Sequence, residues 1–183
     1  MNKKYSLIAF FIGVTIASLQ AQSSSIHAKI LVGFEQWKTS AIKNGSYANA
    51  ANCNMERVTK DGYKGPFTGI PEEISIHYAD INGDGTLDGL VTFHPKQCDG
   101  GNAMMNVQDR VLVLSKGTGY TTDAKYINNI EKQKDGWLSV TGASDGIIFG
   151  TYYNYTAEDG RCCPSIKKPF TIDFKTKKLE IDN

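Results

Sequence analysis

The chain shows two different periods of hydrophobic residues, and the first of them is helical. Between residues 26 and 41, apolar side chains recur at spacings of three and four, which places them on one face of a helix. This face consists of Ile26, Ile30, Phe34, Trp37 and Ala41. We predict an amphipathic helix that Ser25 caps at its start and that Asn44-Gly45 ends.

Beyond Pro71 the hydrophobic period changes to two, and β-branched and aromatic residues become common. This pattern predicts strands at residues 74–78, 90–93, 111–114, 137–140, 147–155 and 168–174, and a further strand at 179–181 after a turn. One helix followed by six or seven short strands predicts an α+β fold. In the expected architecture, the N-terminal amphipathic helix packs on a twisted antiparallel sheet.

The first residues have the pattern of an export signal. Lys3 and Lys4 precede an apolar run at residues 7–19, and a polar stretch follows directly. Such a run is too short to span a membrane and has the charge order of a secretory signal. We therefore predict a signal peptide at residues 1–21 and a single domain at residues 22–183, exported to the periplasm or the cell exterior. The exported chain contains no second apolar run long enough for a membrane span.

The composition and charge of the chain indicate which kinds of partner it is expected to bind. Hydrophobic residues make up 40% of the chain and charged residues 21%, which is close to a globular average. The 20 Lys and Arg residues nearly balance the 19 Asp and Glu residues, and the basic residues form no long cluster. We therefore do not expect a nucleic-acid-binding surface.

Residues 80–88, with the sequence Asp-Ile-Asn-Gly-Asp-Gly-Thr-Leu-Asp, place oxygen-bearing side chains at alternating positions. Calcium prefers several hard oxygen ligands, and a loop of this kind supplies them as its backbone wraps the ion. The predicted ligands are the main-chain carbonyl of Thr86 and the side chains of Asp80, Asn82, Asp84 and Asp88. An EF-hand loop needs a Glu where Val91 stands, so Asp88 has to close the coordination shell here.

The loop resembles the D-x-[DN]-x-D-G-x-x-D calcium loops of dockerins, thrombospondin type 3 repeats and FG-GAP propeller proteins. The resemblance covers nine residues of 183, and it implies calcium binding alone, because one copy forms neither a propeller nor a paired dockerin. The alternative is a metal-free turn rich in Asp, Asn and Gly. We expect a structural calcium ion that neutralises the carboxylates. With the segment 161–165, the loop also makes the chain similar to uncharacterised exported bacterial proteins.

The four cysteines, Cys53, Cys98, Cys162 and Cys163, are an even number in a chain predicted to be exported, which favours disulfide bonds. A bond between the two neighbouring cysteines would close a strained ring. We therefore predict two disulfides, in which Cys53 and Cys98 each pair with one of the neighbours, and either of the two arrangements fits. Zinc is the rival interpretation, but the chain has no CxxC pair.

Catalytic chemistry has weak support in the sequence, and a secreted hydrolase is the least favoured class. His77, His94 and Cys98 are the first candidates for an active site. A disulfide at Cys98 would remove the nucleophile. A hairpin symmetric about Asp84 would place the two histidines on opposite faces of the ribbon.

Two binding functions remain. Residues 95–109 form a long connection without periodicity, and such loops are often functional. We predict that residues 99–109, with Asn102 and the adaptable contact residues Met104 and Met105, bind a protein partner. The chain would then be a protein-binding module of the cell envelope, such as an inhibitor or an immunity protein against a secreted toxin. The alternative is a carbohydrate- or cell-wall-binding module, with stacking rings drawn from Tyr120, Tyr126, Trp137, Tyr152, Tyr153 and Tyr155.

Overall fold

The computed structural model describes residues 5–49, 53, 68–98, 107–160 and 163–182, and its first element is one long helix. Helix α1 (Tyr5–Lys43) passes through Ser25 without a break, so the predicted start and its Ser25 cap are wrong. No proline interrupts this stretch, and the helix therefore continues upstream of the amphipathic part. Its end is as predicted: Gly45 has a positive φ of 78°, and the Ser46 N–H bonds the Ala41 carbonyl at 2.9 Å. Within the described ranges, no helix has the length and apolarity needed to cross a membrane.

The strands of the described ranges form two four-stranded sheets and one two-stranded sheet. The first sheet has the order β2-β3-β5-β6 and consists of β2 (Ser75–Ala79), β3 (Asp88–Phe93), β5 (Asp109–Lys116) and β6 (Gly119–Asp123). The second sheet has the order β10-β9-β8-β7 and consists of β7 (Trp137–Ser144), β8 (Ile147–Asn154), β9 (Ile166–Asp173) and β10 (Lys178–Ile181). The small sheet pairs β1 (Thr68–Gly69) with β4 (Lys96–Gln97), and the short helix α3 (Tyr126–Glu131) follows β6.

The α+β class with antiparallel sheets is confirmed, whereas the prediction of one sheet is wrong. All of the predicted strand segments are present, as β2, β3, β5, β7, β8, β9 and β10. The alternation of apolar residues marks where strands run, but it carries no information on which strands pair. The predicted strands are divided between two four-stranded sheets that pack on each other, and β1, β4, β6 and α3 were not predicted.

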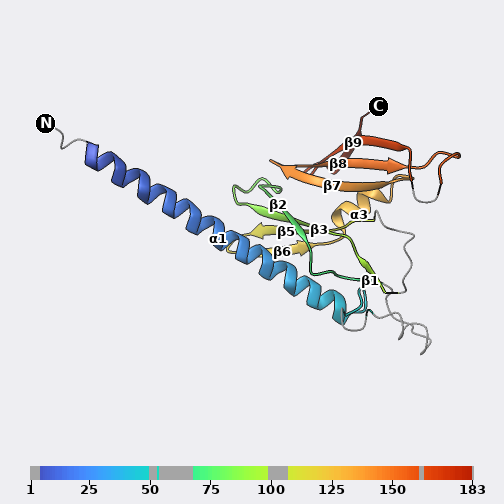
Figure 1. Cartoon of the computed structure of the whole chain (residues 1–183), viewed down its shortest axis with the longest axis horizontal. Helices are drawn as coiled ribbons and strands as arrows, with labels where there is room; N and C mark the ends of the chain where they lie inside the picture. The colour runs from blue at the N-terminus through green and yellow to red at the C-terminus, as the bar shows by residue number, and fades with distance from the viewer. Residues whose placement is uncertain (1–4, 50–52, 54–67, 99–106, 161–162, 183) are drawn as a thin grey trace.

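Three layers result, in which the first sheet lies between α1 and the second sheet (Figure 1). Ile30 and Phe34 of α1 are fully buried against Val91 and Val113 of the first sheet. Gly89 permits this close approach, because a Cβ at that position would lie 2.4 Å from Ile30 Cγ2. The N-terminal part of α1 extends beyond the sheets in Figure 1.

The main core lies between the two sheets. Leu90 and Leu112 of the first sheet meet Leu138, Ile148 and Phe170 of the second, and all five are 0–1% exposed. The helix α3 adds two buried isoleucines to the same cluster. Burial of this apolar surface is the largest favourable contribution to the stability of such a fold.

Strand β7 is an edge strand of the second sheet, and side chains from other elements cover its open edge. Gln108 accepts a hydrogen bond from the Val140 N–H at 2.7 Å and donates one to the Val140 carbonyl at 3.0 Å. Arg110 donates to the Leu138 carbonyl, and Glu131 accepts from the Leu138 N–H at 2.7 Å. These bonds occupy backbone groups that would otherwise be open to pairing with another strand.

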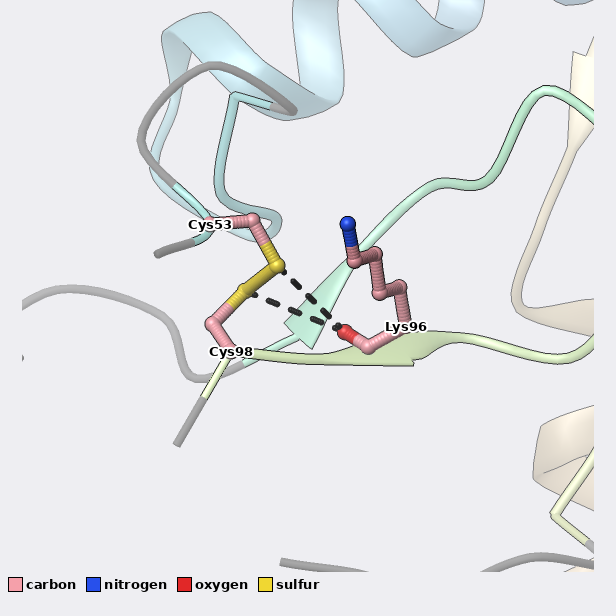
Figure 2. The surroundings of a disulfide bond; sticks show 3 residues. All are labelled: Cys53, Lys96 and Cys98. Carbon is pink, nitrogen blue, oxygen red and sulfur yellow. Dashed lines mark hydrogen bonds between the residues drawn. A yellow bond between two sulfur atoms is a disulfide. The ribbon is translucent and has the colours of Figure 1, made fainter. Parts of the chain in front are cut away.

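The disulfide of the described residues joins Cys53 to Cys98, with Cα atoms 4.5 Å apart (Figure 2). The predicted pairing of each with one of the neighbouring cysteines is therefore wrong. The pairing of β1 with β4, which the periodicity of the sequence did not reveal, brings the segment after α1 beside Cys98. In Figure 2 both sulfurs face the Lys96 carbonyl oxygen, each at 3.8 Å. Cys163 is also disulfide-bonded, and Cys162 lies outside the described residues.

Candidate functional site

The predicted calcium loop connects two neighbouring strands of the first sheet, β2 and β3. The last pair before the loop is Ala79 with Asp88, and His77 pairs with Leu90. This register differs by one residue from a hairpin symmetric about Asp84. Gly83 and Gly85 have φ angles of 78° and 83°, which non-glycine residues rarely adopt, so the two glycines allow the chain to turn here.

Asp80 organises the first half of the loop through its carboxylate. Its Oδ1 accepts hydrogen bonds from the backbone N–H groups of Gly83 at 2.8 Å and Asp84 at 3.0 Å. Its Oδ2 accepts a bond from the Gly85 N–H at 2.8 Å. The backbone therefore curls around this carboxylate, which gives the loop one defined conformation.

Asp84 is held by a partner on another strand. Its Oδ2 accepts a hydrogen bond from the Ser115 hydroxyl of β5 at 2.6 Å, and its Oδ1 accepts one from the Thr86 N–H at 2.9 Å. The Ser115 bond is the main cause of a pKa of Asp84 below its ordinary value. The Asn82 amide donates to the same Asp84 oxygen at 3.3 Å. Ser115 is a residue of this site that sequence reasoning missed, because 31 positions separate it from Asp84.

Asp88 lies inside the molecule, with 0% of its surface exposed. Its Oδ2 accepts hydrogen bonds from the N–H groups of Ile81 at 2.8 Å and Asn82 at 3.0 Å, and its Oδ1 accepts one from the Ser115 N–H at 2.6 Å. The side chain thus ties both ends of the loop to β5 from within. These hydrogen bonds give Asp88 a structural role, and its role as a calcium ligand that closes the coordination shell stays a prediction.

The oxygen donors of the loop suit a hard cation such as calcium. Asp80, Asp84 and Asn82 supply carboxylate and amide oxygens, and the carbonyl of exposed Thr86 lies in the same turn. In the part of the chain that the structure describes, no three His, Cys, Asp or Glu side chains are placed together to hold a metal. The donor set therefore fits calcium in its chemistry.

The candidate catalytic residues were His77, His94 and Cys98. Among the described residues, no contact joins these three side chains into one active site. His94 contacts the Val107 carbonyl through Nδ1 at 3.2 Å, and burial lowers the pKa of His77. Cys98 is bridged, so it provides no nucleophile. The predicted partner-binding residues Asn102, Met104 and Met105 lie outside the described residues.

A cavity of about 270 Å³, which the sequence did not indicate, lies where β2 begins and β3 ends. Its lining combines the carboxylate of Glu73 and the imidazole of His94 with the apolar side chains of Ile74 and Phe93. Gln108, a buried residue of the lining, already bonds the backbone of β7. The cavity is therefore a small mixed pocket without a free buried polar group among its described lining residues.

Three of the predicted stacking rings have structural roles instead. Tyr152 is buried, with 9% of its surface exposed, and packs in the core between the sheets. Tyr126 stacks on Phe174 with ring centroids 4.7 Å apart, and burial raises its pKa to about 12. Tyr120 donates its hydroxyl to the Leu87 carbonyl at 3.0 Å, next to the loop.

The other three rings form one cluster on the second sheet. Trp137 lies parallel to Tyr153, with an interplanar angle of 15° and ring centroids 5.6 Å apart. Tyr155 contacts the same tryptophan with a centroid distance of 5.4 Å and is 42% exposed. These rings come from β7, β8 and the residue after β8, so the sheet itself brings them together.

Asp159 shapes the turn that leads to Cys163. Its Oδ2 accepts hydrogen bonds from the N–H groups of Thr156 at 2.7 Å and Ser165 at 2.9 Å, and from the Ser165 hydroxyl at 3.0 Å. These bonds, the Ser165 N–H first, lower its pKa to about 2. The turn is therefore held by an ionised carboxylate at neutral pH.

Comparison with known proteins identifies no relative: no protein-family model, no curated protein and no solved structure matches this chain.

Proposed function

We propose that this chain is an exported binding module of the cell envelope whose Asp80–Asp88 loop holds a structural calcium ion. The observation that supports calcium is the hydrogen-bonded arrangement of the oxygen donors in the loop. Asp80 gathers three backbone N–H groups, and Ser115 fixes Asp84, in an exposed turn rich in oxygen donors. With the proposed ligands Asp80, Asn82, Asp84, Thr86 and Asp88, a calcium ion would neutralise the carboxylates and stiffen the connection between β2 and β3.

The packing of α1 supports export with removal of residues 1–21. Ile26, Ile30, Phe34 and Trp37 pack against the first sheet, and all four are downstream of the proposed cleavage site. Cleavage would therefore leave the packed part of the helix in place. We expect the secreted product to begin near Gln22, and its intact mass tests this. A secreted chain that retains its first residues would contradict the proposal.

Calcium is expected to raise the melting temperature of the exported chain. With a dissociation constant of about 10⁻⁴ M, about 1 mM calcium stabilises the folded state by roughly 1.4 kcal/mol. For a domain of this size, that corresponds to a rise of about 3–6 °C over the sample with chelator. Thermal unfolding with calcium and with chelator measures the difference. Magnesium at the same concentration is the comparison ion, because its small octahedral shell suits such a loop poorly.

The matched variants are Asp84→Ala in the loop and Asp135→Ala, an exposed aspartate before β7. We expect Asp84→Ala to abolish the calcium-dependent rise and Asp135→Ala to keep it. Equal melting curves of the unmodified chain with calcium and with chelator would rule out a stabilising site under these conditions.

We propose a protein partner for the module, bound through residues 99–109, of which the structure describes residues 107–109. A second candidate function, carbohydrate binding, has more specific support among the described residues. Trp137, Tyr153 and Tyr155 form an aromatic cluster on the second sheet, and Tyr155 is 42% exposed. Exposed aromatic rings can stack on the apolar C–H face of a sugar.

A further inference from the structure

The register of the second sheet places Trp137, Tyr153 and Lys167 in one row across β7, β8 and β9. The neighbouring row contains Leu138 and Tyr152, which are buried in the core between the sheets. Since side chains alternate between the two faces of a strand, the first row points away from the core. Lys167 is exposed, so this row joins two stacked aromatic rings to a cation on the outer face.

A third aromatic ring, that of Phe149, lies farther along the same face. Phe149 pairs with Gly142 and is 38% exposed. Its ring atoms lie 2.5–3.4 Å from the position that a Cβ of Gly142 would occupy, so the ring covers the glycine. One side of the ring therefore packs on the sheet, and the other side is available to a ligand.

Hydroxyl groups lie between the two aromatic positions. Ser139, Thr151 and Pro169 form the intervening row, and both hydroxyl residues are partly exposed. Phe149 and Tyr153 are four residues apart on β8, which corresponds to roughly 13 Å along the strand. The face thus presents a ring, a row of hydroxyls, and then a pair of rings with a cation.

The charges on this face are unevenly placed. Lys167 is the charged residue of the Trp137 row, and none of the ion pairs of the described residues includes it. Asp173 and Glu180 lie at the opposite end of the face, where Lys178 bonds Glu180 at 2.6 Å. The Trp137 row therefore presents a cation, Lys167, that can pair with an anionic group of a ligand.

We propose that this face binds an acidic saccharide chain, with sugar rings stacked on Phe149 and Tyr153 and a carboxylate paired with Lys167. This inference rests on the carbohydrate-binding candidate function and names its ligand class and site. The hydroxyls of Ser139 and Thr151 would bond the hydroxyl groups of the sugar between the rings. A neutral saccharide would lack the pairing with Lys167 and bind more weakly.

The test uses the full exported chain with an oligogalacturonate, a chain of uronic acids, and a cello-oligosaccharide of equal length as the neutral probe. Titration followed by NMR maps the site, and calorimetry measures affinity. We expect the uronic acid chain to bind more tightly and to shift the Trp137 indole and the Phe149 ring. Phe149→Ala should weaken binding about tenfold. Lys167→Gln should lower the affinity for the acidic chain to that for the neutral chain.

Matched controls come from the outer surface of α1, which lies on the other side of the first sheet. Val32→Ala removes an apolar side chain that is 56% exposed, and Lys29→Gln removes an exposed cation. Both should leave saccharide binding unchanged. Thr151→Val keeps the shape of the side chain and removes its hydroxyl, and it should also weaken saccharide binding. This variant replaces Phe149→Ala in the test if Phe149→Ala is too unstable to measure.

Each contrary result has a distinct meaning. Equal binding of both saccharides at these residues would overturn the acidic ligand and leave carbohydrate binding standing. No shifts with either saccharide would overturn the site and the carbohydrate candidate, while calcium-dependent melting would still test the loop on its own. Binding of single-stranded oligothymidylate with the same dependence on Phe149 and Lys167 would assign the face to nucleic acid instead.

Discussion

Replacing Asp88 with alanine is expected to destabilise the fold by about 3–5 kcal/mol. Its carboxylate is fully buried and accepts hydrogen bonds from three backbone N–H groups, those of Ile81, Asn82 and Ser115. Alanine would leave these donors unpaired, and each buried unpaired donor costs about 1–3 kcal/mol. The connection between β2 and β3 would also lose its anchor on β5. Urea unfolding of the variant and the unmodified chain measures the loss.

Measuring the loss of stability with calcium and with chelator separates the hydrogen-bonding role of Asp88 from calcium binding by the loop. Asp88→Ala should still cost about 3–5 kcal/mol in chelator, because its hydrogen bonds need no metal. Asp84→Ala should have its main effect in calcium. Glu73→Ala, at an exposed carboxylate before β2, serves as the control and should leave stability nearly unchanged. A loss of less than about 1 kcal/mol for Asp88→Ala in chelator would show that the buried carboxylate is not an anchor.

The elements of this fold could be predicted from the sequence where one face of each element is buried. The helical spacing of Ile30 and Phe34 and the alternation around Ile172 are direct consequences of burial on one side. Strand β6 escaped prediction because its residues, Gly-Tyr-Thr-Thr-Asp, show no apolar alternation. The helix α3 is short, and only Ile127 and Ile130 are buried, too few for a period to be recognised.

Strand pairing and long-range contacts could not be predicted for a different reason. Local patterns do not encode which distant segments meet, so the division into two sheets and the Cys53–Cys98 disulfide were missed. The same limit applies to the loop. Its Asp and Gly spacing indicated a turn with oxygen donors, but the role of Ser115 depends on β5 pairing beside β3. The oxygen donors were visible in the sequence, whereas the residue that fixes them was not.

A polar cluster around Arg110 lies in the interior, and its loss is the second change that we expect to lower the stability of the fold strongly. Arg110 is 5% exposed and donates to Glu131 Oε2 at 2.7 Å, Glu131 Oε1 at 3.2 Å and Asn128 Oδ1 at 2.8 Å. It also donates to the Leu138 carbonyl at the edge of β7. One side chain therefore connects β5, α3 and the second sheet.

Arg110→Ala is expected to cost about 3–5 kcal/mol, because it leaves the Glu131 carboxylate without its cation and the Leu138 carbonyl without its side-chain donor. Arg110→Lys should recover only part of this loss, since a lysine cannot form the bidentate contact. The exposed pair of Lys178 and Glu180 is the control: the side chain of Lys178 is 70% exposed, and Lys178→Ala should produce no measurable change. Urea unfolding decides, and an Arg110→Ala variant within about 1 kcal/mol of the unmodified chain would contradict the proposed role. Because Arg110→Ala also uncovers the edge of β7, the variant should aggregate during refolding at concentrations where Lys178→Ala stays monomeric.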